Sequence, residues 1–202
     1  MTCGKLIPTF REIVFIMAEK YYPERWPNIV EECVSILQTS SNLEGLLGAV
    51  ETLKAIYSVF GGSIMKEIQL NNLSNKSILP LLTLASKLFQ NFNQETAYVL
   101  VGIFKTFSTA ILNSMPEIIM LNIHNLMIFV KKILDLPADL SSQENNSLFI
   151  LKKISLRILF RIYQKHANPK MTQSNNDFAY RFHSSYTKPF VETLMLQVMF
   201  KD

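Results

Sequence analysis

Apolar residues recur along this chain at three- and four-residue steps, the spacing of a helix with one buried face. Residues 6–20 show the pattern first, and residues 43–60 and 148–167 show it most clearly. No stretch of useful length alternates between apolar and polar residues as a half-buried strand does. The pattern therefore predicts an all-α protein.

The predicted helices form antiparallel pairs joined by short polar connectors. Residues 5–20 are expected to form the second helix of a pair whose first helix is not in this sequence. Three complete pairs are expected to follow, over residues 25–62, 77–113 and 116–168, the last with a polar connector over 137–146. Residues 185–200 are expected to form the first helix of a further pair. A segment over 178–182 is expected to pack back on the array. The second helices begin near residues 43, 94 and 147, at intervals of about fifty residues, slightly longer than HEAT repeats. This regularity favours an α-α superhelix of stacked armadillo/HEAT-type pairs, while a closed bundle is the structural alternative.

Residues with special backbone properties predict where several helices begin and end. Pro27 and Pro116 fit first helical turns, and Asn93 is expected to cap the following helix. Ser41 and Ser114 each precede a glutamate by three residues, the spacing of a capping box. Gly61-Gly62 predicts a left-handed helix end, and the Asn-rich residues 63–75 predict a connector with a single helical turn.

The composition suits a folded protein, with 49% hydrophobic and 18% charged residues over 202 positions. The two cysteines, Cys3 and Cys33, are too few for a disulfide framework. No apolar run is long enough for a membrane helix, so no membrane insertion is expected. His124, on an otherwise apolar helix, is expected to be a core residue. Because metal-ligand spacings, phosphate-binding loops and catalytic motifs are missing from the sequence, we predict no enzyme activity and no cofactor.

The most distinctive polar feature is a basic stripe on one predicted helix: Lys153, Arg157, Arg161 and Lys165. Residues four apart share a helix face, and no acidic residue occurs between Glu144 and Asp177 to neutralise them. The stripe is either a solvated face or a contact strip for an acidic partner. Direct nucleic-acid binding is not expected, because Phe160 and Tyr163 are assigned to packing and leave no exposed rings for bases. A basic nucleic-acid-binding domain is kept as a third hypothesis.

Two stretches resemble importin-beta-type nuclear transport receptors, or karyopherins. One is Tyr-Pro-Glu-Arg-Trp-x-x-Ile-Val at residues 22–30, and the other is the Lys-Lys-containing helix 152–163 followed by Asn168-Pro169 and Phe178-Ala179. The second stretch is most similar to the importin-seven and importin-eight branch, although the connector 137–146 is shorter than is common there.

The resemblance implies a HEAT-repeat superhelix that carries protein cargo, contacts nuclear pore proteins, shuttles between cytoplasm and nucleus and is regulated by the small GTPase Ran. It also implies a piece of the N-terminal half that begins within a repeat, with most of the Ran-binding region elsewhere. Residues 5–20 and 43–60 would face the concave side, and Arg11 and Lys54 are the exposed candidates for partner binding there. A helical-repeat scaffold of another pathway is the alternative function.

Overall fold

The computed structural model describes residues 3–61, 66–137, 146–167 and 176–192. Over these ranges the chain is helical and contains no strand. The helices, in chain order, are α1 (Cys3–Tyr21), α2 (Ile29–Thr39), α3 (Leu43–Phe60), α4 (Glu67–Gln90), α5 (Gln94–Ala110), α6 (Glu117–Leu121), α7 (Ile123–Asp135), α8 (Asn146–His166), α9 (Asn176–Phe182) and the π-helix η3 (His183–Thr187). The prediction of an all-α protein is confirmed.

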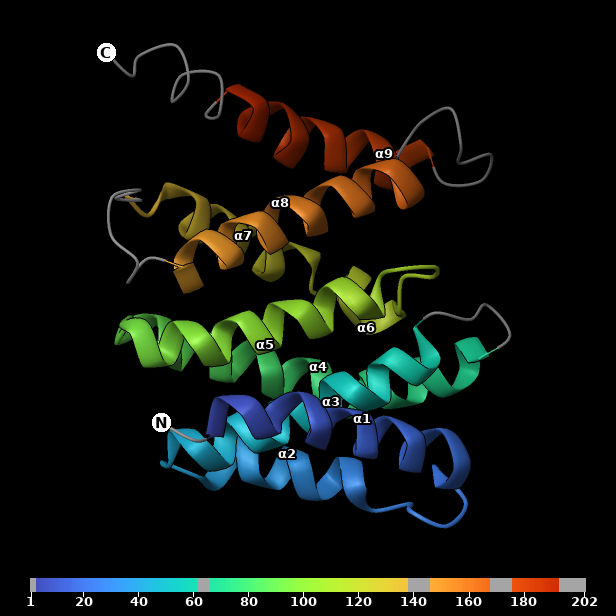
Figure 1. Ribbon diagram of the computed structural model, residues 1–202. Coiled ribbons are helices and arrows are strands. Elements are labelled where there is room, and N and C mark those ends of the chain that lie inside the picture. The colour runs from blue at the N-terminus through green and yellow to red at the C-terminus, as the bar shows by residue number, and fades with distance from the viewer. Residues whose placement is uncertain (1–2, 62–65, 138–145, 168–175, 193–202) are drawn as a thin grey trace.

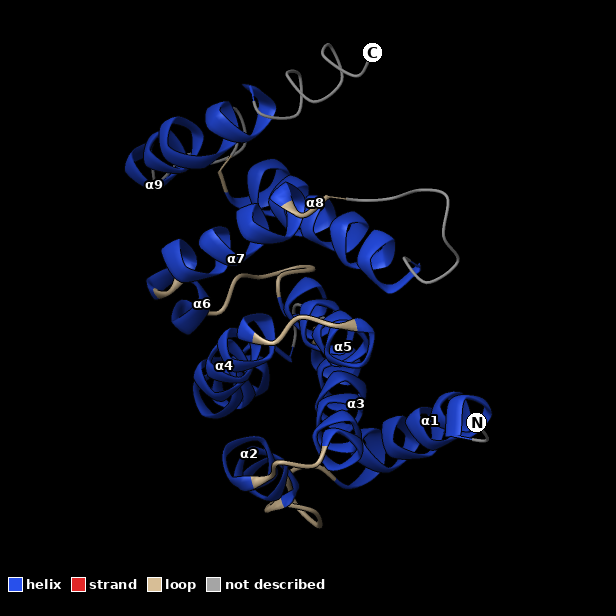
Figure 2. Cartoon of the chain, turned by 90° about the vertical axis from the view of Figure 1, so that its left-hand side faces the viewer, coloured by secondary structure: helices blue, strands red, loops and turns tan. Residues whose placement is uncertain are grey.

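The helices lie in two rows, between which the chain alternates (Figure 2). In one row α1, α3, α5 and α8 pack consecutively, each against the next; we call this the second-helix row. The other row holds α2, α4 and α6, also packed consecutively, followed by α7 and α9. Cross-row packing joins α2 to α3, α4 to α5 and α7 to α8. In Figure 1 the helices follow one another in chain order, with the N-terminal helices at the bottom and the C-terminal helices at the top.

One continuous apolar core runs between the rows, from α1 to the residues beyond η3. Its largest fully buried side chains include Tyr57, Phe104, Phe107 and Phe182, which come from α3, α5 and α9. Phe104 and Phe107 pack edge to face with ring centroids 5.8 Å apart. Among the described helices, the most extensive contacts join neighbours within a row or partners across the two rows.

Helix α4 differs most from its prediction. The Asn-rich residues 71–75, expected in a connector, lie within a helix that begins at Glu67 and continues through Pro80. The Tyr57 hydroxyl of α3 lies 3.2 Å from Ser74 Oγ and 2.9 Å from Ser77 Oγ. Both serines are fully buried, so tertiary hydrogen bonds stabilise a helix that the local sequence does not favour.

Two capping predictions have opposite outcomes. Asn93 caps α5 as expected: its side chain accepts from the Thr96 backbone N–H at 2.9 Å, and Thr96 Oγ1 accepts from the Asn93 N–H at 2.8 Å. The capping box predicted at Ser41 is wrong. Asn42 is the N-cap of α3, because its side-chain oxygen accepts from the Glu44 N–H at 3.0 Å.

The end of α3 is set by close packing and not by a left-handed cap. Gly61 is right-handed, with φ of −68°. A Cβ atom there would lie 2.5 Å from the Thr109 carbonyl oxygen of α5, a contact that only a glycine avoids. The α2 boundary also differs slightly, since Pro27 precedes the N-cap Asn28 and does not occupy the first turn.

The helix expected over 116–136 is broken in two. Pro116 is the N-cap of the short α6 and makes no side-chain capping bond, so the box predicted at Ser114 is also wrong. Asn122 separates α6 from α7, and its Nδ2 donates to the Ile118 carbonyl at 2.9 Å. Residues 178–182 pack back on α8, as predicted. Of the helix expected over 185–200, residues 185–187 belong to the π-helix η3, residues 188–192 are helical, and residues 193–200 lie outside the described residues.

Candidate functional site

Neighbouring helices of the second-helix row are packed in a constant register. Arg161 of α8 reaches Ser108 of α5, 53 residues earlier, at 2.5 Å from its carbonyl and 2.7 Å from its hydroxyl. Gly102 of α5 lies over Val50 of α3, 52 residues earlier, where a Cβ would meet Val50 Cγ1 at 2.7 Å. Residues about 51 to 53 positions apart therefore lie side by side on α3, α5 and α8.

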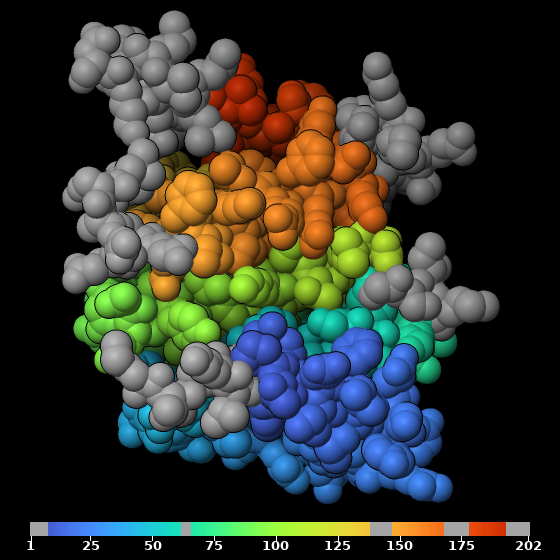
Figure 3. Space-filling model, in the orientation of Figure 1, coloured from blue at the N-terminus to red at the C-terminus, as the bar shows by residue number. Residues whose placement is uncertain are grey.

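This register generates a surface that we call the open face, where side chains of the second-helix row meet solvent. It consists of residues in equivalent positions on three helices: Glu44 and Leu47 on α3; Glu95, Tyr98 and Lys105 on α5; Ser147, Ile150 and Arg157 on α8. Lys54 of α3 occupies the position equivalent to Lys105 and Arg157 but is buried. Figure 3 shows α5 in green and α8 in orange uncovered on this side, with α1 in blue below them. Along α5 and α8 this face changes from acidic or polar, through apolar, to basic.

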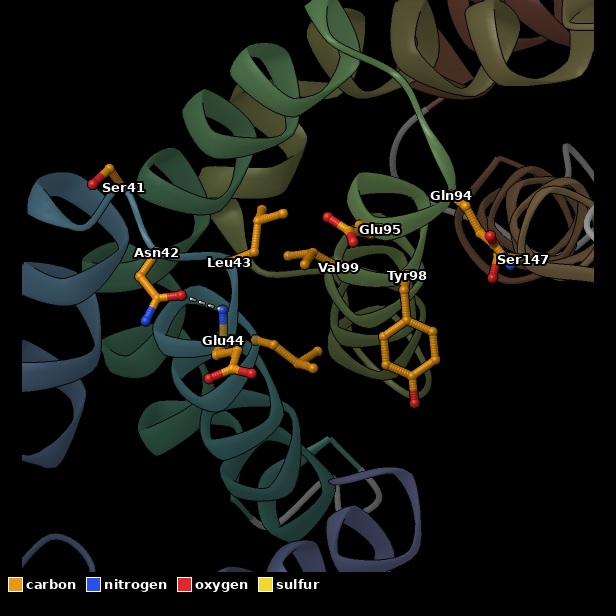
Figure 4. Close-up of a pocket in the computed structure, with 10 residues that line it drawn as sticks. Ser41, Asn42, Leu43, Glu44, Gln94, Glu95, Tyr98, Val99 and Ser147 are labelled. Carbon is orange, nitrogen blue, oxygen red and sulfur yellow. Dashed lines mark hydrogen bonds between the residues drawn. The ribbon is translucent and has the colours of Figure 1, made fainter. Parts of the chain in front are cut away.

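Its N-terminal edge is a shallow groove of about 720 Å³ between α3 and α5 (Figure 4). Glu44 and Glu95 lie at the first turns of these two helices, and Leu47, Tyr98 and Val99 supply the apolar wall. Carboxylates at helix N-termini are stabilised there by the helix dipole, so the two glutamates have a structural reason for their position. The groove is open, and the polar residues that line it in the described part of the chain are exposed or half-buried.

A three-residue charge cluster joins α1 to α3. The Glu51 carboxylate accepts from Arg11 Nε at 2.8 Å and lies 2.6 Å from Arg11 Nη2. Lys54 Nζ, one turn further along α3, donates to both oxygens of the same carboxylate. Glu51 and Lys54 are each only 5% exposed. One carboxylate thus holds two cations from two helices.

The expectation that Lys54 is exposed is wrong, whereas Arg11 is half-buried with its guanidinium on Glu51. Burial lowers the pKa of Lys54 to about 8; the bonds to Glu51 oppose this effect, and the charges of Arg11 and Lys105 add to it. Lys54 is buried beside Glu51, and Arg11, 43 positions earlier in the sequence, binds the same carboxylate from α1. No local pattern in residues 43–60 indicates that packing.

The basic stripe of α8 divides into two halves. Lys153 and Arg157 are exposed. Arg161 instead donates to Ser108, and Lys165 donates to the Leu112 carbonyl and, at 3.4 Å, to Asn113 Oδ1. Carbonyls at a helix C-terminus lack intrahelical partners and attract cations. Arg161 and Lys165 therefore join α8 to the end of α5, whereas Lys153 and Arg157 are exposed without such a bond to α5.

The aromatic residues near the stripe also differ from expectation. Phe160, assigned to packing, is 60% exposed, and Phe149 on the same face is 55% exposed. Tyr163 does pack on the core and lies with its ring 6.3 Å from that of His183. Among the described second-helix residues, large exposed apolar side chains concentrate on the outermost helices α1 and α8, while α3 has none. These two faces are the ends of the packed row.

The histidines form no site. His124 was predicted to be a core residue, and this prediction is wrong because His124 is exposed. Its Nδ1 lies 2.9 Å from the Tyr186 hydroxyl. Burial lowers the pKa of His166. Within the described ranges no group of three His, Cys, Asp or Glu side chains could hold a metal ion. No described helix has the length and apolarity needed to cross a membrane.

Two residues of this region were not among the predicted site residues, Glu51 and Lys105. Lys105 is exposed on α5, 51 positions after Lys54 and 52 before Arg157. Lys105 could have been predicted from the sequence, because the interval of about fifty residues between helix starts also separates it from the charged residues Lys54 and Arg157. Comparison with family models, curated proteins and solved structures finds no match to this chain.

Proposed function

We propose that this chain is a run of HEAT-type helix pairs whose function is to bind other proteins along its open face. The observation that carries the proposal is the constant register of the second-helix row, in which residues 51 to 53 positions apart lie side by side. A solenoid builds an extended binding surface in this way, one equivalent position per repeat. The concentration of exposed apolar residues on α1 and α8 fits an array whose pairs stack end to end.

Within this class, the chain is proposed to belong to a nuclear transport receptor of the importin-beta family. Support comes from the resemblance of residues 22–30 and 152–163, and from the structural positions of both stretches. Tyr22 is buried where α1 turns towards α2, with its ring 5.6 Å from that of Phe60. Lys152 donates to the Leu134 carbonyl at 2.8 Å and to the Leu136 carbonyl, and so joins α8 to the end of α7. Tyr22 thus lies at the turn between α1 and α2, and Lys152 fixes α8 to the end of α7.

The proposed activity is transport of protein cargo through nuclear pores, with contacts to pore proteins, shuttling between cytoplasm and nucleus, and release controlled by Ran. No catalysis and no cofactor is part of it. Arg11 and the exposed half of the α8 stripe are the proposed partner contacts, and Lys54 acts indirectly by fixing the Glu51 carboxylate that orients Arg11.

Binding to Ran tests the receptor proposal. The longest form of the protein that its gene encodes is immobilised, and Ran loaded with GTP or GDP is passed over it. A receptor prefers the GTP-loaded form by a large factor, because that preference drives cargo exchange. Equal binding of both forms, or none, would reject the receptor.

A helical-repeat scaffold of another pathway is the second candidate. The open face and its register favour it equally, since neither depends on the two landmark stretches. Affinity purification of the same long form distinguishes the candidates: a scaffold retains its partner when GTP-loaded Ran is added, whereas an import receptor releases it.

A further inference from the structure

Two exposed rings and two exposed cations share one side of α8. Phe149 is 55% exposed and Phe160 is 60% exposed. Lys153 and Arg157, which lie between these rings in the sequence, are exposed as well, and Leu156 beside them is 38% exposed. We call these five residues the α8 face. The expectation against direct nucleic-acid binding rests on the assignment of Phe160 to packing, and the exposure of its ring removes that ground.

The apolar and the cationic residues of the α8 face follow two neighbouring lines along the helix. Phe149, Leu156 and Phe160 are separated by seven and four residues, which keeps them close to one line at 3.6 residues per turn. Lys153 and Arg157 follow a line that is rotated from the first by roughly a sixth of a turn. A nucleic-acid strand has its bases on one side and its charged phosphates on the other. A strand laid along α8 therefore meets the rings with its bases and the cations with its phosphates.

Each ring also has a cation as its neighbour on the helix surface. Phe149 and Lys153 are four residues apart, a spacing that brings side chains together on a helix. Arg157 and Phe160 are three residues apart and are neighbours in the same way. One base can stack on each ring while the adjacent cation neutralises a phosphate. The rings are about 16 Å apart along the helix axis, so a strand that advances at least about 3.4 Å per nucleotide reaches both within about five nucleotides.

The charges around the α8 face favour an anion along most of its length. The sequence of α8 itself contains no acidic residue. Arg161 and Lys165 donate to backbone carbonyls of the α5 end, keep their positive charge and continue the cationic line towards the helix C-terminus. At the other end of α8, Ser147 lines the groove that also contains Glu95. A strand displaced beyond the first ring is therefore repelled by a carboxylate.

A single nucleic-acid strand fits this surface better than a partner protein does. The centre of a protein–protein interface is apolar and depleted of charged residues. On the α8 face Lys153 and Arg157 lie directly beside the apolar line, so charge borders the apolar surface along its length. An acidic peptide would pair with the cations and leave the rings without flat groups to stack on. Every nucleotide supplies both a phosphate and a base that stacks, whatever its sequence.

We propose that the α8 face binds single-stranded nucleic acid without sequence preference, with bases stacked on the two rings and phosphates paired with Lys153 and Arg157. The inference goes beyond the proposed transport function and does not depend on Ran. Because that function assigns the same two cations to a protein partner, nucleic acid and that partner are expected to compete for them. Failure of the oligonucleotide experiment would remove this site and leave the Ran experiment unaffected.

The test measures fluorescence anisotropy of a labelled uridine oligonucleotide of about ten nucleotides, titrated with the whole 202-residue chain between about 50 and 200 mM salt. The affinity is expected to fall as salt is added, because each neutralised phosphate releases counterions. Two phosphate contacts predict a slope of about −1.4 or steeper in the plot of log affinity against log salt concentration.

Substitutions locate the site and separate stacking from charge. Phe149→Ala and Phe160→Ala are each expected to weaken binding by about fivefold or more with an unchanged salt slope, because a stacked ring carries no charge. Phe10→Ala deletes an exposed ring of α1, at the other end of the second-helix row, and is the matched control. Lys153→Gln is expected to reduce the salt slope by about 0.7, whereas Lys87→Gln, at an exposed position of α4, leaves it unchanged. Circular dichroism of each variant establishes that the helices are retained.

Losses confined to the two ring variants and Lys153→Gln would support the proposal. It would be overturned by an oligonucleotide that does not bind at about 50 mM salt, by unchanged affinity in both ring variants, or by an equal loss in Phe10→Ala. Equal affinity for a glutamate peptide of the same length would also overturn it and would assign the α8 face to acidic protein segments.

Discussion

Replacing Glu51 by glutamine tests the charge cluster, because it removes the charge that holds Lys54 in a buried position. In the native chain burial lowers the pKa of Lys54 to about 8, below its ordinary value of 10.5. The unfolded chain therefore binds more protons than the folded chain between these values, and stability rises with pH there, by about 3 kcal/mol in total. Below pH 8, Lys54 is charged in both states and contributes no pH dependence.

Without the Glu51 charge, the pKa of Lys54 falls further, towards the values of about 5–6 known for unpaired buried lysines. The variant then folds with a neutral Lys54 over most of the range from pH 6 to 8. For each unit that the pH falls within that range, the variant loses about 1.4 kcal/mol of unfolding free energy relative to the native chain. The destabilisation by Glu51→Gln is thus expected to be on the order of a few kcal/mol at pH 6, to shrink as the pH rises to 7, and to become small near pH 8.

Urea unfolding followed by circular dichroism, repeated from pH 6 to pH 9, gives the two stability curves. Glu31→Gln is the matched control, since Glu31 forms an exposed pair with Lys76 at 2.5 Å and its loss is expected to cost under about 1 kcal/mol. If the Glu51→Gln curve runs parallel to the native curve between pH 6 and 8, the proposed dependence of Lys54 on Glu51 is refuted.

Three further substitutions test the packing, each measured by urea unfolding at pH 7. Gly61→Ala is expected to cost about 1–3 kcal/mol by forcing a Cβ onto an α5 carbonyl, whereas Gly48→Ala, with open space around it, gains about 0.5–1 kcal/mol; effects of the same sign would contradict this. Tyr57→Phe removes the hydroxyl bonded to two buried serines of α4 and is expected to cost about 1–2 kcal/mol, so an unchanged midpoint would show those bonds to be unimportant. Arg161→Ala removes two hydrogen bonds to α5 and is expected to lower the free energy of unfolding by about 1.5 kcal/mol. Arg157→Ala, at an exposed position, is expected to change it by less than about 0.5 kcal/mol. Equal losses in the two variants would contradict the proposed role of Arg161 in joining α8 to α5.

The sequence was a good guide where local periodicity determines structure. Helix α8 lies within two residues of its predicted bounds, because its apolar positions repeat regularly over five turns. The Asn93 cap was predictable since both of its hydrogen bonds are formed within three residues. The interval of about fifty residues between second helices reappears as the packing register of α3, α5 and α8.

Predictions failed where distant residues decide the outcome. Residues 71–75 are polar enough for a loop, but the buried Tyr57 hydroxyl bonds to serines in the same helix and stabilises it. The local sequence predicts an exposed Lys54, yet Lys54 is buried and shares the Glu51 carboxylate with Arg11 of α1. Phe160 has the character of a core residue and is exposed because it lies on the last helix of the packed row.

The stacked register underlies both proposed functions, and distances between spin labels test it most directly. Labels are placed on cysteines substituted for Glu44, Glu95 and Ser147, equivalent positions of α3, α5 and α8, after replacement of Cys3 by serine; Cys33 is buried. Stacking predicts neighbouring labels separated by roughly 10 Å and the outer pair by about twice that distance, because the steps add along the row. An outer pair as close as the neighbouring pairs would indicate helices closed around a single core and contradict the account.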